Sequence, residues 1–551
     1  MNRIAKNKVI VMMVLVCFLF QPIRDAYGLD GLTVESGSIT IDDSTANTLK
    51  ITADSNNTIL NWTGGFDIAS NESIYFYMPS SSSNVLNKDT SGNISSILGA
   101  LYANGNIYII NPKGITFGPG ANIDVGGLVA SSLSMSNQDF LNGNMAFNKM
   151  GGDAASILNQ GNITGDKFVA LLSDSIRNEG VIQANQGTVV LASGKAMTLN
   201  FGGDNLIDVV VTQATDTKKT GVDDAIVNIG SVSADAGKVL VRASTVKDVF
   251  RNAVNNEGVI KANKVIDEGG VISIVADDDV VSTGTLEAIG GTIEIESTGA
   301  VKSLGTLKTD TFMETGASLY LAGIAEVGLY SHIENADNAV TYGTGSYSGP
   351  YSDVANIIID TNAVITLTGA TTFTADSDSS GGGQFNMYSG SSIVGGGNDL
   401  TLYASQSSYL RSITGVGALN IYEKKASSNP MYYLYNDIGV NTFTLNSGRF
   451  YASSSMTLTS SGNFTVSGGT LYGDRMTITV DNGNFAFSGG TFNTGGLIIL
   501  DATNGDCSFS GDGQTFSQVL FKNTSDTTDR TITLGSGTMT FTDFYLAATG
   551  A

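Results

Sequence analysis

Few residues in this 551-residue chain have the type and spacing that enzyme chemistry needs. His332 is the only histidine, so a serine or cysteine nucleophile activated by histidine would depend on it alone. No Gly-x-Ser-x-Gly elbow accompanies it. We therefore expect His332 to lie in a solvated loop and to take no part in catalysis.

Oxygen ligands for a metal ion are the second chemistry to consider. Residues Asp277–Asp279 are three consecutive carboxylates, the ligand type that Ca²⁺ prefers. They lie between the apolar pairs Ile274-Val275 and Val280-Val281, which favours a solvated turn at a strand end. The segment Gly395–Leu400 resembles a calcium-binding nonapeptide only loosely and is not repeated in tandem. We expect no catalytic residue, no metal site and no cofactor.

Tyrosines gather between Tyr409 and Tyr435, where Tyr432, Tyr433 and Tyr435 nearly follow one another. Such rings can form an adhesive ladder on the surface. They can equally pack between strands, because aromatic residues favour strands. The sequence leaves both interpretations open.

Composition excludes several classes of protein. The chain has 28 Lys and Arg against 51 Asp and Glu, a net charge of -23, so it has no basic surplus to bind nucleic acid. Its 41% hydrophobic residues are too many for a disordered chain. Charged residues make up only 14%, so we expect Ser, Thr, Asn and the 67 glycines to cover the surface.

Residues 1–28 have the pattern of a signal peptide for the general secretion machinery. Arg3, Lys6 and Lys8 precede an unbroken apolar run, Val9–Phe20, and small residues follow at Ala26 and Gly28. The run is too short to span a membrane. Cleavage after residue 28 would leave Cys507 as the only thiol, so no disulfide could form within the mature chain.

Short internal repeats predict the fold. Asn178–Asn185 recurs at Asn256–Asn263, and Gly448, Gly469 and Gly490 are spaced by 21 residues. Alternating strands broken by Gly and Asn, at repeats of 20 to 30 residues, indicate an all-β, right-handed parallel β-helix with irregular insertions in its N-terminal half. Asn suits the corners because stacked Asn side chains can hydrogen-bond along the axis.

Several ordered blocks give a resemblance to a known family. They are Asn61-Trp62, Ile74–Asn87, Ile94–Gly99, Ala103–Gly118 and Ala121–Ser131. Together they resemble the N-terminal secretion domain of filamentous haemagglutinin and other two-partner secretion exoproteins. The resemblance implies a β-helix with an N-terminal cap. It also implies a partner, an outer-membrane barrel transporter with periplasmic docking domains, and a protein that is secreted or held on the surface of a Gram-negative-type cell.

The candidate recognition residues come from the block that resembles the family most clearly: Asn104, Gly105, Asn111, Pro112, Gly114, Ile115, Phe117 and Gly118. The family's Asn-Pro-Asn-Gly tetrapeptide has Lys113 at its third position here. A type I turn accepts most residues at that position, so we expect the turn to form and to present neighbouring strand edges to the transporter. The alternative is a connecting turn with no recognition role.

The sequence thus predicts a non-enzymatic, adhesin-like exoprotein. Residues 29–260 would be the secretion domain, and residues 261–551 a repetitive β-rod that offers its surface to a host or neighbouring-cell receptor or glycan. One alternative is a polysaccharide-active enzyme on the same fold, which would need carboxylates and Lys or Arg converging in a groove. The other is the truncated stalk of a toxin-delivery exoprotein, although residues 531–551 still follow the Gly-Thr strand pattern.

Overall fold

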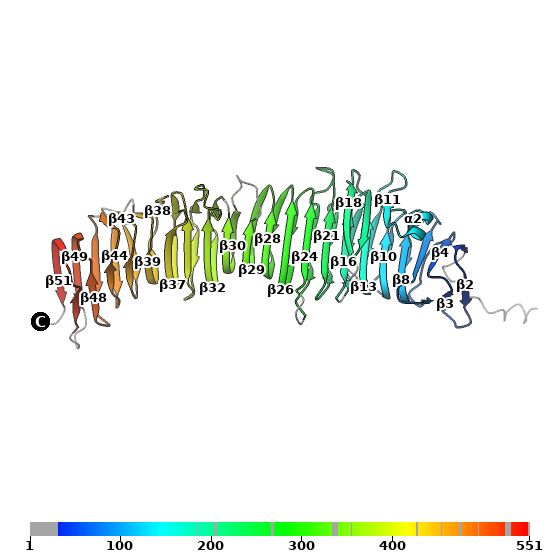
Figure 1. Ribbon diagram of the computed structural model, residues 1–551, viewed down its shortest axis with the longest axis horizontal. Helices are drawn as coiled ribbons and strands as arrows, with labels where there is room; N and C mark the ends of the chain where they lie inside the picture. The colour runs from blue at the N-terminus through cyan, green and yellow to red at the C-terminus, as the bar shows by residue number, and fades with distance from the viewer. Residues whose placement is uncertain are drawn as a thin grey trace, which may run out of the picture.

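The protein is a long, slightly bent rod of stacked β-strands (Figure 1). This computed structural model describes residues 31–548 except 185, 203–206, 266–268, 333–339, 354, 426–427, 453–454, 473–475, 494 and 524–529. Among these residues the only helix is α2 (Asn137–Asn142), and it is too short to cross a membrane. The predicted signal peptide, residues 1–28, lies outside the described residues.

The strands stack in parallel columns, so the predicted all-β parallel β-solenoid is confirmed. In one column β13 (Asn162–Ser173), β16 (Thr188–Ser193), β21 (Lys238–Ala243) and β24 (Val271–Ala276) pair in register. A second column contains β14 (Ser175–Asn178), β19 (Ile226–Asn228), β22 (Val254–Asn256) and β25 (Val280–Ser282). A third contains β15 (Val181–Gln183), β20 (Ser231–Ser233) and β23 (Val259–Lys261). Each coil therefore has three short strands, one for each side of the rod.

The N-terminal end departs from parallel pairing. Strand β1 (Leu32–Ser36) is antiparallel to β4 (Asn57–Trp62), and β2 (Ile39–Asp42) is antiparallel to β3 (Thr48–Ala53). Strands β3 and β4 then pair in parallel with β5 (Ser73–Tyr77) and β6 (Asn84–Asp89). That these first strands act as a cap stays a prediction.

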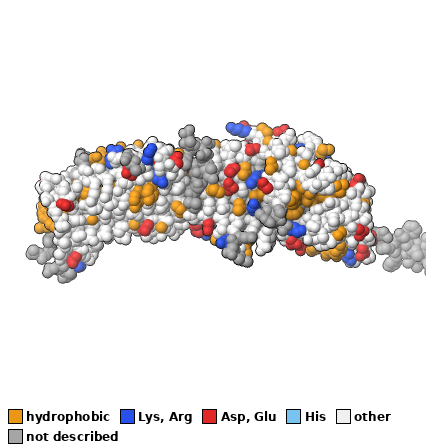
Figure 2. Space-filling view, viewed as in Figure 1, with side chains coloured by type: hydrophobic (Ala, Val, Ile, Leu, Met, Phe, Trp, Pro, Cys, Tyr) orange, Lys and Arg blue, Asp and Glu red, His pale blue; other side chains and the backbone are white. Residues whose placement is uncertain are grey.

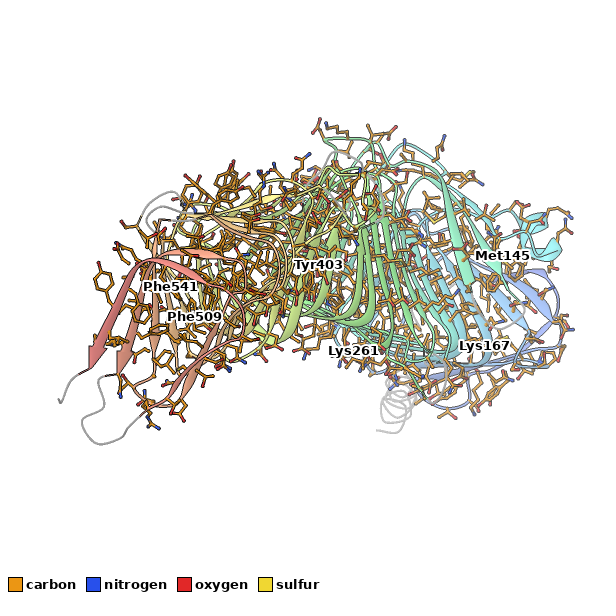
Figure 3. The ribbon with its side chains drawn as sticks, turned by 60° about the vertical axis from the view of Figure 1, so that its left-hand side comes forward. Met145, Lys167, Lys261, Tyr403, Phe509 and Phe541 are labelled. Atoms are coloured by element: carbon orange, nitrogen blue, oxygen red, sulfur yellow. The ribbon has the colours of Figure 1, made fainter. Side chains whose placement is uncertain are left out.

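A single apolar column fills the inside of the rod, because inward side chains of equivalent strands stack on one another. Phe443, Phe464, Phe485 and Phe509 lie in this column with ring centroids 4.8, 5.3 and 4.7 Å apart. Phe541 packs beside Phe509 near the C-terminal end (Figure 3). Equivalent residues of successive coils thus build the core.

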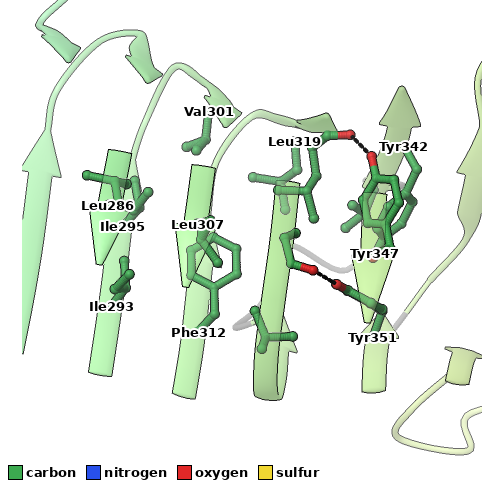
Figure 4. Close-up of a cluster of buried hydrophobic side chains, with 14 of the residues drawn as sticks. Leu286, Ile293, Ile295, Val301, Leu307, Phe312, Leu319, Tyr342, Tyr347 and Tyr351 are labelled. Atoms are coloured by element: carbon green, nitrogen blue, oxygen red, sulfur yellow. Dashed lines mark hydrogen bonds between the residues drawn. The ribbon is translucent and has the colours of Figure 1, made fainter. Parts of the chain in front are cut away.

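Two buried tyrosines in the same column have backbone partners for their hydroxyls. Tyr347 donates to the carbonyl oxygen of Leu321 at 2.9 Å, and Tyr351 donates to that of Ala325 at 2.8 Å (Figure 4). Burial raises the pKa of both phenols. The hydrogen bonds satisfy polar groups that would otherwise be costly inside an apolar core.

Asparagines and glycines form the corners, as the repeats predicted. The side-chain amides of Asn159, Asn178, Asn228 and Asn256 form one chain of hydrogen bonds, with 2.8 Å between successive partners. Farther along, Gly448, Gly469 and Gly490 all have φ angles near +80° and lie in register. The 21-residue spacing is therefore one coil of the rod.

A second apolar cluster lies outside the rod, on one side of the N-terminal half. Outward side chains of the first column, such as Tyr108, Val129 and Val190, are buried under two excursions from the coils. The first excursion carries α2 and β11 (Ala146–Asn148), and the second is a hairpin of β17 (Ala196–Phe201) and β18 (Ile207–Gln213). Strands β11, β17 and β18 form a separate antiparallel sheet, which accounts for the irregular insertions.

The candidate chemical residues are dispersed. Asp277–Asp279 form the predicted turn between β24 and β25, where Asp279 Oδ1 accepts the Ala300 N–H at 2.8 Å. The described residues contain no group of three His, Cys, Asp or Glu placed to hold a metal ion. The expectation of a loop at His332 is wrong for its backbone, because β29 (Ser318–His332) ends at that residue. Continued pairing with β28 (Thr306–Thr315) keeps it in the strand.

Candidate functional site

The Asn111–Gly114 segment forms the predicted tight turn between β8 (Ala100–Ile110) and β9 (Ile115–Phe117). The Asn111 carbonyl oxygen accepts a hydrogen bond from the Gly114 N–H at 2.9 Å, which closes a four-residue turn. Asn111 Oδ1 accepts a second bond from the Lys113 N–H at 2.8 Å. The turn is thus fixed by its own residues, with Pro112 at the position where proline presets the backbone.

Asn111 also connects this turn to the coils before and after it. Its side-chain amide donates to the carbonyl oxygen of Asn93 at 2.8 Å and to Ser95 Oγ at 2.9 Å. Its backbone N–H donates to the Ser131 carbonyl oxygen at 3.0 Å in the next coil. Asn111 is only 1% exposed, so its side chain is a buried structural bridge. Any recognition role must act through the shape that it holds.

Gly114 has no room for a side chain. Its φ angle is +110°, which disfavours any residue with a Cβ atom. A Cβ placed there would lie 2.6 Å from the carbonyl oxygen of Ser156 in the next coil. Gly105 is restricted by close approach alone, since a Cβ would lie 2.7 Å from the Ser83 carbonyl oxygen. At Gly118 the nearest contact is the flexible end of Leu98, so the restriction there is weaker.

The other candidate residues stabilise the coil by hydrogen bonds on its surface and by packing in its core. Asn104 is exposed, and its amide both donates to the Met78 carbonyl oxygen at 2.9 Å and accepts from the Met78 N–H at 2.8 Å. Ile115 and Phe117 are fully buried in the apolar column. The structure therefore brings the eight residues into one coil and gives most of them a structural role.

A groove lies between the turn and the first excursion. It has a volume of about 580 Å³, and Ile110, Pro112, Met135 and Met150 form its apolar walls. Met150 is 69% exposed, which is unusual for a methionine beside an apolar surface. Figure 2 shows hydrophobic side chains gathered on the N-terminal third of the rod. The groove is the apolar hollow in the turn's surroundings.

Polar groups surround the groove. Lys88 donates to Asn137 Oδ1 at the start of α2, and burial lowers the pKa of Lys88 below its usual range. Ser136 caps α2 by accepting the Asp139 N–H at 3.0 Å. Lys113 points outward, half exposed, and forms only a surface ion pair with Asp153 at 3.4 Å. Lys113 therefore occupies a permissive position, as its place in the turn predicted.

Sequence reasoning did not find this groove, because one wall comes from the first excursion. The available signal was a set of continuous apolar runs, such as Ile107–Ile110 and Val169–Leu172. Alternating strands have one buried side, whereas unbroken apolar strands are buried on both. These runs indicate that something must cover the outside of the rod in this region.

The strands beside the turn offer no free edge. Strand β8 pairs with β5 and β6 on one side and with β10 (Asn122–Ser131) on the other. Strand β9 pairs with β7 (Ser95–Ile97) and β12 (Ser156–Asn159). The expectation that the turn presents neighbouring strand edges is therefore wrong for the folded domain, because stacking coils occupy both edges of each strand.

A second pocket contains carboxylates and arginines together, the arrangement that a polysaccharide-active enzyme would need. It measures about 260 Å³ and is lined by Asp223, Asp224, Arg177, Arg251 and Glu257 among others. Both oxygens of the buried Asp224 are already occupied: Oδ1 accepts from Arg251 and Asn252, and Oδ2 from Arg251 and Asn255. Asp224 thus holds its loop in place and has no lone pair free to act on a substrate.

Comparison with known proteins adds to this geometry. Residues 28–300 match the family model described as the TPS secretion domain. A heme/hemopexin-binding protein of Haemophilus influenzae strain Rd is 30% identical over 281 residues, which cover 49% of this chain and 30% of that protein. Another H. influenzae protein of that name is 29% identical over 265 residues, 44% of this chain and 27% of that protein. The aligned part of this chain thus covers less than a third of the length of these relatives.

A solved structure was also found, the crystal structure of the HMW1 secretion domain from Haemophilus influenzae. It aligns with a TM-score of 0.42 and 20% sequence identity, over 94% of this chain and 99% of that chain.

The class of protein follows from the fold and the matched segment: a β-solenoid exoprotein that carries a secretion domain at its N-terminal end. The chain belongs, through residues 28–300, to the two-partner secretion exoproteins. Proteins of this class are exported across the outer membrane of a Gram-negative cell and are secreted or held at its surface.

Proposed function

We propose that an outer-membrane barrel transporter recognises residues 29–260 and that residues 261–551 form a rod displayed outside the cell. The general secretion machinery would deliver the chain to the periplasm, where the transporter's docking domains bind it. Stacking of coils outside the cell would then make return unfavourable, since each coil adds buried apolar area and hydrogen bonds. The match to a secretion domain is the observation that carries this proposal.

Docking uses the groove beside the Asn111–Gly114 turn in this proposal. Its support is a contiguous apolar wall with an exposed methionine, next to a turn whose shape is fixed by a buried asparagine and a glycine. Apolar side chains of the partner would fill the groove, and Lys113 and Asp139 would lie at its polar rim. Recognition would therefore read the surface that the turn and the first excursion form together.

The groove is tested by placing a charge in it. Met150→Glu should lower secretion at least tenfold when it is co-expressed with the cognate transporter, because docking would have to bury the carboxylate. Met150→Leu, which keeps the apolar surface, is the matched control and should be secreted normally. The measurement compares protein in the medium with protein held in the periplasm. Equal secretion of both variants would place recognition elsewhere in residues 29–260.

The exoprotein is proposed to be non-enzymatic. The support is the bonding of Asp224, whose oxygens each accept two hydrogen bonds in a pocket where carboxylates and arginines meet. Incubation with pectin, alginate or other acidic glycans should therefore release no products. Cleavage that disappears in Asp224→Asn would establish the alternative, an enzyme on the same fold. The rod's proposed partner is a receptor or glycan on a host or neighbouring cell.

A further inference from the structure

A column of tyrosines runs along one side of the rod in its C-terminal half. Strands β36 (Ser408–Leu410), β38 (Met431–Leu434), β40 (Arg449–Ala452) and β43 (Thr470–Tyr472) stack in register. Tyr409 is opposite Tyr433, which is opposite Tyr451, and Tyr451 is opposite Tyr472. The neighbouring residues in each strand are buried, so these four tyrosines point outward. They extend over about 14 Å, the length of three coil spacings.

A second column lies beside the first at the corner of the same coils. Arg411 follows β36, and Tyr435 follows β38 one coil later, with the Tyr435 N–H bonded to the Leu410 carbonyl oxygen at 3.1 Å. The Arg411 guanidinium lies 4.5 Å from the centroid of the Tyr435 ring, and the Tyr409 and Tyr435 rings are 5.9 Å apart. Tyr388 lies one coil earlier, directly after β33 (Phe385–Met387). We call the six tyrosines and Arg411 the tyrosine face.

The tyrosine face keeps both its rings and its hydroxyls accessible. Tyr388, Tyr409 and Tyr435 are 44%, 39% and 37% exposed. Within the described residues, none of the six hydroxyls has a hydrogen-bond partner, whereas the inward Tyr432 donates to the Tyr422 carbonyl oxygen at 2.7 Å. Packing against neighbouring strands covers part of each ring. The rest of the ring and its hydroxyl group remain exposed to solvent. Both interpretations that the sequence left open therefore apply. The inward ring of Tyr432 packs in the core, and the outward rings form a ladder on the surface.

Charge near the tyrosine face differs from that of the whole chain. Residues 388–472 contain four Lys and Arg (Arg411, Lys424, Lys425 and Arg449) against three Asp and Glu (Asp399, Glu423 and Asp437). The segment thus has a net charge of +1 in a chain of net charge -23. A neutral or anionic partner meets no net repulsion at this segment. A polycation would instead be attracted to the acidic remainder of the rod.

The chemistry of this surface fits a sugar better than a protein. Of the four large apolar residues that are exposed in the described part of 388–472, three are tyrosines and the fourth is Val394. Tyr and Arg also anchor protein interfaces, so residue type alone does not decide between the two partners. The regular repeat favours the sugar, because one outward ring in each of four successive coils offers similar groups at even spacing to a polymer of repeating units. A pyranose ring places its C–H groups against an aromatic face and its hydroxyls within reach of phenol and guanidinium groups.

We propose that the tyrosine face binds an extended glycan whose chain runs along the rod axis. Rings repeat with each coil, and the planes of neighbouring rings differ by 30° between Tyr409 and Tyr433 and by 77° between Tyr433 and Tyr451. A polymer of repeating sugars can therefore contact several rings by their faces or edges, and weak contacts add up when they are linked. Arg411 would orient the chain and would strengthen binding where the sugar carries a carboxylate. The inference rests on the proposed function only in that the rod must be displayed outside the cell.

The test uses purified protein covering residues 29–551, so that its result does not depend on secretion. Dextran, a soluble cellulose derivative and hyaluronan serve as neutral and acidic probes in affinity gel electrophoresis. We expect at least one of them to retard the protein. The variant Tyr409→Ala/Tyr433→Ala should weaken that retardation at least tenfold. The matched control is Tyr403→Ala/Tyr422→Ala, which removes a stacked pair 4.7 Å apart on another strand column and should bind normally.

Several results would overturn the proposal. They are no retardation by any of the three probes, equal retardation of both double variants, or binding of the surface to a purified protein receptor without any glycan. The variant Tyr409→Phe/Tyr433→Phe keeps both rings and should retain most of the binding, with circular dichroism as a check on folding. Loss of glycan binding with normal secretion, or the reverse, separates this inference from the groove proposed for docking.

Discussion

The side-chain amide of Asn178 donates to Asn228 Oδ1 at 2.8 Å although 50 residues separate them in the sequence. Both side chains are buried, and Asn228 in turn donates to Asn256 Oδ1 at 2.8 Å. The second excursion leaves the rod between Asn178 and Asn228 and returns without disturbing this line of amides. The corner ladder therefore keeps successive coils aligned across a long insertion.

Removal of one amide from this ladder should destabilise the rod. In Asn228→Ala the buried Asn256 Oδ1 loses its donor, and the Asn178 amide keeps only its longer contacts with the Gly180 and Ser231 carbonyl oxygens. The two broken hydrogen bonds cost about 2–4 kcal/mol. Urea denaturation followed by circular dichroism, which reports on strands along the whole rod, measures the effect. The control is Asn463→Ala in the exposed pair Asn463–Asn484, where a change below about 0.5 kcal/mol is expected. Equal losses of unfolding free energy in Asn228→Ala and Asn463→Ala would show that the buried ladder contributes no more stability than the exposed pair.

The glycine corner of the C-terminal half should tolerate no side chain. Gly469 has a φ angle of +80°, and a Cβ atom would lie 2.3 Å from the Gly448 carbonyl oxygen. We expect Gly469→Ala to cost at least about 2 kcal/mol, from backbone strain and overpacking together. Gly505→Ala is the comparison, since a Cβ there meets no atom within 4 Å. Thermal unfolding followed by circular dichroism measures both variants, and an unchanged Tm for Gly469→Ala would show that the coils can move apart.

Much of the fold was accessible from sequence because a solenoid repeats its contacts. The recurrence of Asn178–Asn185 at Asn256–Asn263 predicted stacked corners, and the structure places Asn178, Asn228 and Asn256 in one hydrogen-bonded ladder. The 21-residue spacing of Gly448, Gly469 and Gly490 predicted the coil length. Period alone was sufficient here, since each coil contacts only its neighbours.

The surroundings of the candidate site were less accessible, because they depend on contacts that do not repeat. Asn111 looked like a recognition residue in the sequence, yet it lies buried between three coils. Met150 comes from the first excursion, whose sequence has no repeat to mark where it packs. Only the tertiary fold brings Met150 beside Pro112, so no local pattern could have paired them.

Stability should fall as the pH rises from 5 to 8. Asp353 is completely buried, and desolvation raises its pKa to about 7. A carboxyl group with a raised pKa in the folded state contributes stability below its unfolded pKa, and that stability is lost as the pH rises through the folded value. The expected loss between pH 5 and 8 is roughly 2 kcal/mol, by conversion of the shift in pKa.

The pH effect is assigned to Asp353 by substitution. Asp353→Asn keeps the size and the acceptor for the Ala355 N–H but cannot ionise. Its Tm should therefore change less between pH 5 and 8 than that of the unmodified protein. If both proteins lose stability equally over this range, another buried group is responsible.

The turn itself gives the sharpest test of recognition. Asn111→Ala removes a buried bridge between coils, and Gly114→Ala places a methyl group against the Ser156 carbonyl oxygen with an unfavourable φ angle. Lys113→Ala changes only an exposed side chain and a surface ion pair. We expect the first two to lower secretion at least tenfold and the third to have little effect, in co-expression with the cognate transporter. Asn111→Ala and Gly114→Ala also weaken the fold, so their secretion alone does not distinguish lost recognition from lost stability. Secretion of Met150→Glu, which changes only an exposed side chain, makes that distinction. A secretion defect in Asn111→Ala and Gly114→Ala with normal secretion of Met150→Glu would mean that the turn supports folding of the domain and that the transporter binds another surface.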